Sequence, residues 1–173
     1  MIDFLEILKY TLPALIVFMT AYLLIQKLLD NEHRLKKIEL IHNSEQYLLP
    51  IRLQAYERLV LFLERISPES LLMRINRQNM TAKQLHTELL TNIRAEFEHN
   101  LSQQIYVSRE SWEVVRNARS NLIQIINEAA KSIDPKSPSI KLSQTILEVI
   151  IDNEKSPTNL AIDYIKKEVS NLF

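Results

Sequence analysis

The stretch RESWEVVRNARSNLIQIINEAAKSI, residues 109–133, decides the fold class of this chain. Its apolar side chains recur every three or four residues, which is the spacing of one face of an α-helix. The stripe consists of Val115, Ala118, Leu122, Ile125 and Ala129, widened by Ile126 and Ile133. Such a stripe lies in a hydrophobic core far more often than against a cofactor. We therefore expect this helix to pack at the centre of a helical domain.

The rest of the chain repeats this helical periodicity, and no segment keeps the apolar-polar alternation of a strand. Ser-Pro pairs at 67–68, 137–138 and 156–157 mark helix starts, because serine caps the free N–H groups and proline fits the first turn. Thr81 and Gln84 have the spacing of a capping box. The sequence predicts an all-α fold: an N-terminal transmembrane helix followed by a compact bundle of about five to six helices. The expected ranges are a first helix to about residue 45, then 50–66, 68–76, 82–104, 109–133, 139–152 and 158–172.

Composition excludes several classes of function. There is no glycine, which removes phosphate-binding loops, dinucleotide fingerprints and the nucleophile elbow. There is no cysteine, which removes disulfides, thiolate zinc sites and thiol nucleophiles. Lysine plus arginine and aspartate plus glutamate both number 21, so the basic surplus typical of nucleic-acid binders is missing. We expect no nucleic-acid partner and no cofactor.

The most apolar segment runs from Tyr10 to Gln26 without a charge and is bracketed by Lys9 and Lys27. It is a little short of the ~20 residues that cross a bilayer but within the working range. A buried core helix and a cleaved signal peptide are the alternatives; the acidic start disfavours the second. The expected domains are a transmembrane anchor at 1–29, a juxtamembrane helix or linker at 30–48, and a cytoplasmic all-helical domain at 49–173.

Charge predicts the orientation of that span. Four basic residues follow it closely: Lys27, Arg34, Lys36 and Lys37. By the positive-inside rule this side faces the cytoplasm. We expect a single-pass inner-membrane protein with its N-terminus outside and its C-terminal domain in the cytoplasm.

A short self-association seam follows the span. Leu28, Asn31, Leu35 and Ile38 lie on one helical face at close to heptad spacing, and Asn31 could fix the register of a parallel dimer. The seam covers few heptads, so the alternative is a helix that packs on its own domain.

Arg52, Asn100 and Gln104 are expected toward apolar helix faces, with Glu96 on the flank of such a face. Arg52, Glu96 and Asn100 form a candidate buried polar layer, with Glu96 as the leading partner of Arg52. Buried polar groups must be paired. Layers of this kind more often fix packing than carry out chemistry, so we interpret this one as structural.

Two Glu-x-x-His pairs have the spacing of di-iron ligands in four-helix bundles. They are Glu39 with His42 and Glu96 with His99, and Glu57 and Glu64 could nominally complete the set. Neither pair lies at the centre of an apolar face, so we expect ordinary surface pairing and no metal. A lone histidine beside the apolar stripe, His86, is expected to be a hydrogen-bonded core residue.

Three stretches carry a resemblance that covers most of the chain: LKYTLPALIVFMTAY, LPIRLQAYERLVLFLERISPESLLMRI and IRAEFEHNLSQQIYVS, with the closing AIDYIKKEVSNLF. They resemble an uncharacterised family of short, single-span helical proteins from Bacteroidetes-type bacteria. The resemblance implies membrane anchoring and an all-α domain. It implies no activity and no functional residues.

These observations favour a non-catalytic role. The expected function is that of a membrane-anchored adaptor, scaffold or accessory subunit that acts through protein-protein contacts. Its expected partners are the lipid bilayer, an unidentified membrane or cytoplasmic protein, and a second copy in a homodimer. Leu53 and Leu61 are the best candidates for surface contacts. The alternative is a helical-bundle enzyme, or a lipid- or metal-binding protein, with no recognisable motif.

Overall fold

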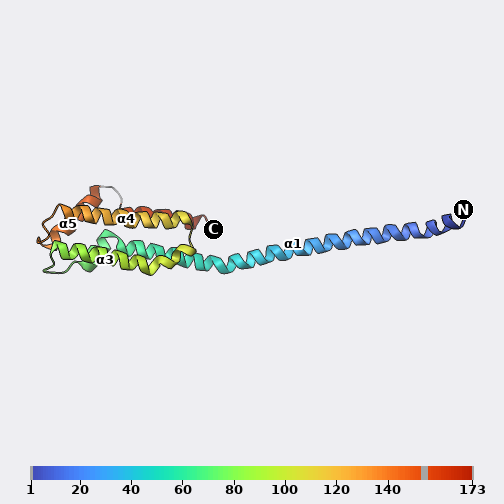
Figure 1. The fold of residues 1–173 in the computed structure, drawn as a ribbon, viewed down its shortest axis with the longest axis horizontal. Coiled ribbons are helices and arrows are strands. Elements are labelled where there is room, and N and C mark those ends of the chain that lie inside the picture. The colour runs from blue at the N-terminus through green and yellow to red at the C-terminus, as the bar shows by residue number, and fades with distance from the viewer. Residues whose placement is uncertain (1, 153–155, 173) are drawn as a thin grey trace. The chain divides into compact units, whose positions relative to one another are not determined.

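A computed structural model describes the backbone of residues 2–152 and 156–172, and the side chains of residues 15–32, 36, 47–151 and 156–172. Figure 1 shows that these residues fold entirely into helices joined by short loops. The elements are α1 (Ile2–Ile66), α2 (Pro68–Ile75), α3 (Ala82–Asn100), the 3₁₀ helix η1 (Leu101–Ile105), α4 (Arg109–Lys131), α5 (Ser139–Asp152) and α6 (Pro157–Ser170). The expected all-α class is confirmed.

The chain divides into two compact units, residues 1–49 and 50–173, and α1 continues through the boundary between them. We expected separate helices before and after Pro50, and this was wrong. Proline removes one backbone N–H from a helix but leaves its neighbours free to continue the ladder. The helix therefore passes Pro50 and ends only before Ser67, where a second proline starts α2.

The core of the second unit is formed by one face of each helix. Within it α4 packs mainly against α6, and α3 packs against α2, α4 and α5. The predicted stripe of α4 is confirmed along its length, because the structure buries Val115, Ala118, Leu122, Ile126 and Ala129. Ile125 and Ile133 are half-buried. Three aromatic rings join α1, α3 and α4: the ring of Phe97 lies 5.9 Å from that of Phe62 and 5.5 Å from that of Trp112.

Helix starts follow the predicted caps. The Thr81 hydroxyl accepts from the Gln84 N–H at 3.2 Å, and the Gln84 side chain accepts from the Thr81 N–H at 3.0 Å. The Ser108 hydroxyl accepts from the Ser111 N–H at 3.0 Å at the start of α4. Helix α3 is shorter than its expected range, because it tightens into η1 after Asn100.

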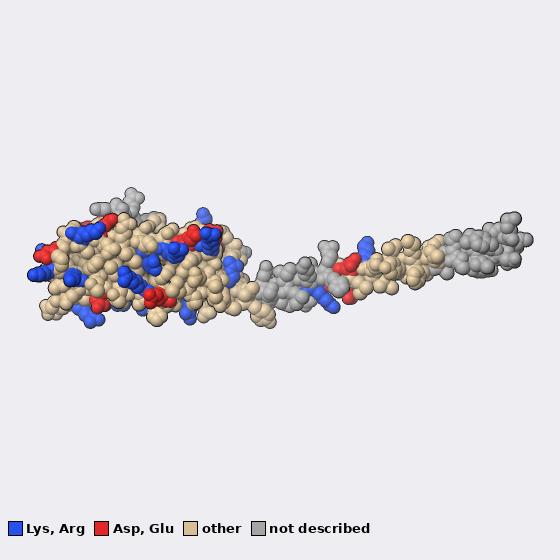
Figure 2. All heavy atoms as spheres, viewed as in Figure 1, with Lys and Arg blue, Asp and Glu red and all other residues tan. Residues whose placement is uncertain are grey.

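In the first unit, α1 exposes large apolar side chains on all of its faces. They are Leu15, Ile16, Val17, Phe18, Met19, Tyr22, Leu23, Leu24, Ile25, Leu28 and Leu29, each more than half exposed. From residue 15 to residue 26 the run carries no charge and is drawn in tan in Figure 2, and Lys27 interrupts it before Leu28 and Leu29. Within the described residues, no helix combines the length and hydropathy required to cross a membrane. The side chains of residues 10–14, with which the expected span begins, lie outside the described residues.

Candidate functional site

The expected polar layer does not form as a single group. Arg52 donates through Nε to the carbonyl oxygen of Tyr106 at 3.3 Å, and its expected partner Glu96 pairs instead with Arg65, at 2.6 Å from Nη2 to Oε1. Arg52 and Arg65 lie about 20 Å apart along α1 at 1.5 Å per residue. Glu96 can therefore face only one of them, and the register of α3 against α1 selects Arg65. Asn100 donates to the Glu96 carbonyl at 2.8 Å, one turn back in its own helix.

A different polar cluster connects residues from the beginning, the middle and the end of the second unit. We name it the Glu168 cluster, and it consists of Tyr56, Ser108, Ser111 and Glu168. The Tyr56 hydroxyl donates to Glu168 Oε1 at 2.6 Å and accepts from the Ser108 N–H at 3.2 Å. The Ser111 hydroxyl donates to Glu168 Oε2. Tyr56 and Ser111 are buried and Glu168 is half-buried. The cluster therefore fastens α6 to both α1 and α4.

The surroundings of Glu168 favour its ionised form. Burial by itself raises the pKa of this carboxyl, but hydrogen bonds from Ser111, Tyr56 and Ser108 outweigh that effect, and the positive charge of Arg52 adds to them. The pKa of Glu168 consequently lies below its ordinary value of 4.5. The described donors come from α1, from the start of α4 and from the residue that caps it, so the arrangement has the properties of a structural fastening.

The Glu-x-x-His pairs do not provide a metal centre in the described part of the chain. Glu96 is engaged by Arg65, and no group of three or more metal-ligating side chains is found among the described residues. The side chains of Glu39 and His42 lie outside those residues. His86 contacts Asn127 Oδ1 through Nε2 at 2.8 Å, which confirms the expected hydrogen bond, but its side chain is half-buried and does not belong to the core.

Several residues singled out in the sequence meet in a hollow between α1 and α3, which we name the Leu61 groove. Its volume is about 580 Å³, and it is lined by Arg58, Leu61, Phe62 and Arg65 from α1 and by Asn92, Ala95, Glu96, His99 and Asn100 from α3. Leu61 is 53% exposed. An exposed leucine surrounded by arginine, glutamate, histidine and asparagine is typical of a small protein contact surface, with an apolar centre and a polar rim. Leu53, the other candidate, is half-buried.

A second hollow lies at the opposite end of α3 and was not found from the sequence. We name it the loop pocket; its volume is about 580 Å³, and it lies between the α2–α3 loop and the α4–α5 loop. Backbone hydrogen bonds join the loops: Ala82 N–H donates to Ser137 at 2.8 Å and Ser139 N–H donates to Met80 at 2.9 Å. Asn79 has a φ of 66°, a left-handed conformation that asparagine adopts more readily than most residues.

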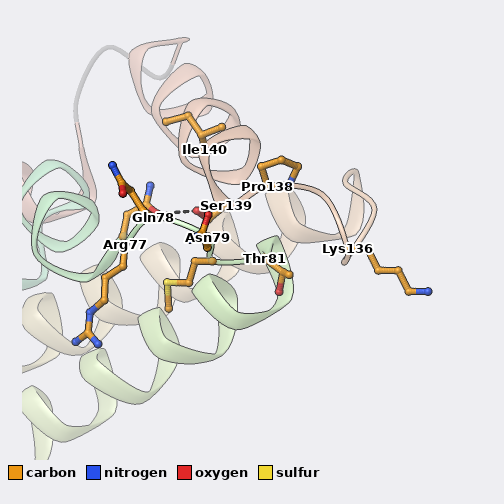
Figure 3. Close-up of a pocket in the computed structure, with 10 residues that line it drawn as sticks. Arg77, Gln78, Asn79, Thr81, Lys136, Pro138, Ser139 and Ile140 are labelled. Carbon is orange, nitrogen blue, oxygen red and sulfur yellow. Dashed lines mark hydrogen bonds between the residues drawn. The ribbon is translucent and has the colours of Figure 1, made fainter.

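Two polar side chains of the loop pocket, those of Asn76 and Ser139, bond one another. Figure 3 shows the hydrogen bond from the Ser139 hydroxyl to Asn76 Oδ1, which measures 2.7 Å, and Asn76 Nδ2 in turn donates to Ser143 at 3.1 Å. The side chains of Arg77 and Lys136 point in different directions (Figure 3). The pocket therefore lacks a converging set of charges for a small ligand, and it is better described as the joint between two loops.

The expected self-association seam is described only in its first half. Leu28 and Asn31 are exposed on α1, and the side chains of Leu35 and Ile38 lie outside the described residues. Self-association through this seam therefore stays a prediction.

Comparison with known proteins identifies one family. The model of a family of unknown function, DUF7935, matches residues 2–172. Neither a curated protein nor a solved structure matches the chain.

Proposed function

Because this chain belongs to DUF7935, a family of unknown function, its role must be inferred from the molecule, and we propose that it is a membrane-anchored adaptor or scaffold. In this proposal the N-terminal part of α1 crosses the inner membrane with its N-terminus outside. The helical domain lies in the cytoplasm and binds a protein partner.

The exposed apolar run of α1 carries the proposal. Eleven large apolar side chains between Leu15 and Leu29 are more than half exposed and surround the helix. Burial of a Leu, Ile or Phe side chain is worth about 1.5–3 kcal/mol, so water is an unfavourable environment for such a run. A helix that is apolar all round is typical of one that is surrounded by lipid or protein. The uncharged sequence begins earlier, at Tyr10, which brings the run close to the length of a span.

Membrane extraction tests the anchor. We expect the full-length protein to stay in the membrane pellet after an alkaline carbonate wash, and the double substitution Phe18→Arg with Leu23→Arg to release it, since each charge is costly in the hydrocarbon. Gln54→Arg, an exposed position on the same helix, is the matched control and should remain in the pellet. Release of the unmodified protein by the wash would contradict the anchor. A reporter that functions only in the cytoplasm should be active when it is fused after Phe173, and a reporter that functions only outside the cytoplasm should be inactive there.

The Leu61 groove supports the adaptor role, because it places an exposed leucine at the centre of a polar rim. A photo-crosslinking amino acid at Leu61 should give one discrete adduct in cells, identified by mass spectrometry. The same amino acid at Gln124, which is exposed on α4, is the control. Identical adducts from both positions, or none from Leu61, would contradict a partner at this groove.

Homodimerisation through the seam is a separate part of the proposal. The chain has no cysteine, so a single introduced thiol reports one contact without ambiguity. Asn31→Cys should form a disulfide-linked dimer in membranes. Gln26→Cys lies on another face of the same helix and should stay monomeric. Equal yields of dimer from the two variants would show random collision in place of a seam.

A further inference from the structure

Helices α3 and α4 run antiparallel, and two contacts fix their register. His86 meets Asn127 at 2.8 Å near one end, and the guanidinium carbon of Arg119 lies 4.0 Å from the centre of the Phe97 ring near the other. As the residue number rises along α3 it falls along α4. This register places Arg94, one turn before Phe97, opposite Arg119 of α4. Arg116 lies one turn before Arg119 on the same face of α4.

Three guanidinium groups therefore gather on one side of the α3–α4 pair. None of them takes part in an ion pair or a side-chain hydrogen bond among the described residues. The acidic residue nearest in α4, Glu113, is engaged by Arg109 at 3.2 Å. Glu98 is exposed one turn beyond Arg94 and likewise forms no ion pair in that part of the chain. The three arginines are therefore left without an ion-pair partner among the described residues, and Glu98 is the acidic side chain that shares their face of α3.

Arg119 is held in place by the aromatic core. Its guanidinium lies over the face of Phe97, which stacks on Trp112 at 5.5 Å, and a cation in this position is attracted by the ring. Its Nε is buried without a hydrogen-bond partner, while the side chain as a whole is only half-buried. The buried part of the group is thus fixed and the terminal nitrogens remain toward the surface. Burial, with the charges of Arg116 and Arg94, lowers the pKa of Arg119, which is the effect expected of crowded cations.

We propose that Arg94, Arg116 and Arg119 form a binding site for a phosphate-class oxyanion, either inorganic phosphate or a phosphomonoester. Guanidinium groups bind tetrahedral oxyanions through paired N–H donors, and a doubly charged anion relieves the repulsion among three neighbouring cations. The stacked Arg119 supplies a preorganised donor, and the exposed Arg94 and Arg116 close on the anion from two helices. The site lies wholly within residues 50–173, so it does not depend on the membrane anchor. The phosphate group could belong to a soluble compound or to a lipid headgroup.

Calorimetric titration of the full-length protein in a neutral detergent tests this site. The titrants are inorganic phosphate and dihexanoyl phosphatidate, with chloride at matched ionic strength and dihexanoyl phosphatidylcholine as their controls. We expect saturable binding of phosphate or phosphatidate and none of the controls. Arg116→Gln and Arg94→Gln should each weaken binding by roughly tenfold or more, as the loss of a charge-assisted pair implies. Arg109→Gln, on the same helix but paired with Glu113, should bind as the unmodified protein does.

The outcomes distinguish a lipid headgroup from a soluble compound as the source of the phosphate group. They also show whether the site exists. Tighter binding of phosphatidate than of inorganic phosphate would assign the anion to a lipid, and equal affinity would assign it to a soluble compound. Because Arg94 and Arg116 are exposed, their variants should fold, and unchanged melting temperatures without phosphate would verify this. Equal weakening by Arg109→Gln would mean an adventitious ion only. Absence of saturable binding of both phosphate titrants would also overturn the proposal.

Discussion

Glu168 and Glu96 are both glutamates on helices that pack in the same domain, but their surroundings differ. Glu168 accepts from the hydroxyl groups of Tyr56 and Ser111, both of them buried and fixed. Glu96 pairs with Arg65, whose side chain is 58% exposed and therefore screened by water. The two carboxylates should contribute very differently to the free energy of unfolding.

Replacement of Glu168 by Gln should destabilise the domain by about 1–3 kcal/mol at pH 7, because buried hydroxyl donors lose a charged acceptor. The loss should depend on pH. The pKa of Glu168 is lowered in the folded state, so the folded state binds fewer protons, and the stabilisation is present above the ordinary pKa of 4.5 and is lost as the pH falls through the lower folded value. Urea unfolding of both proteins between pH 7 and pH 3 measures this. If the difference in the free energy of unfolding between the unmodified protein and the Glu168→Gln variant stays constant over this range, the lowered pKa of Glu168 is contradicted.

Replacement of Glu96 by Gln provides the matched comparison. It removes ion pairs to Arg65 at 2.6 Å and to Arg74 at 3.7 Å, whose side chains are 58% and 36% exposed, so the expected loss is about 0–1 kcal/mol. The same urea titration measures it, and added salt should reduce it further. A loss as large as that from Glu168→Gln would mean that the Leu61 groove is a major source of stability.

At the scale of elements, local chemistry sets where helices begin. The capping box of Thr81 and Gln84 is formed as the spacing predicts. The carbonyl groups of Pro135 and Ser137 satisfy the free N–H groups of Lys83 and Ala82, which no local pattern indicated. The start of α3 is thus held both by its own side chains and by the loop before α5.

Thr81→Ala should cost about 0.5–2 kcal/mol, because the first turn of α3 loses its side-chain acceptor. Thr87→Ala is the control in the same helix: its hydroxyl bonds only the Lys83 carbonyl at 3.0 Å, and alanine is the better helix former. Thermal unfolding followed by circular dichroism compares the two. Equal shifts in melting temperature would show that the cap is redundant with the loop contacts.

At the scale of the molecule, the hydrophobic core formed by the described residues lies within one unit. Its buried residues run from Tyr56 to Ile165, all of them inside residues 50–173. The large apolar side chains described from Leu15 to Leu29 in the first unit are exposed. The second unit therefore contains the whole of the described core that stabilises it.

Residues 50–173 expressed alone should fold and unfold cooperatively, with a melting temperature within a few degrees of that of the full chain, because all the core residues found in the described part of the chain are kept. They should also remain in solution without detergent, since the exposed apolar run is absent. Calorimetry and sedimentation in buffer measure both properties. Loss of a cooperative transition would show that residues 1–49 contribute to the folded core.

Local patterns in the sequence determined the helices, because periodicity, serine and proline caps and apolar stripes act over a few residues. Val115, Leu122, Thr81 and the all-α class were predictable for this reason. Only the tertiary structure decided which polar groups meet. Tyr56 and Glu168 are 112 positions apart, and the choice of Arg65 over Arg52 as the partner of Glu96 depends on helix register. Register is set by the fit of many core side chains at once, and no short stretch of sequence contains that information.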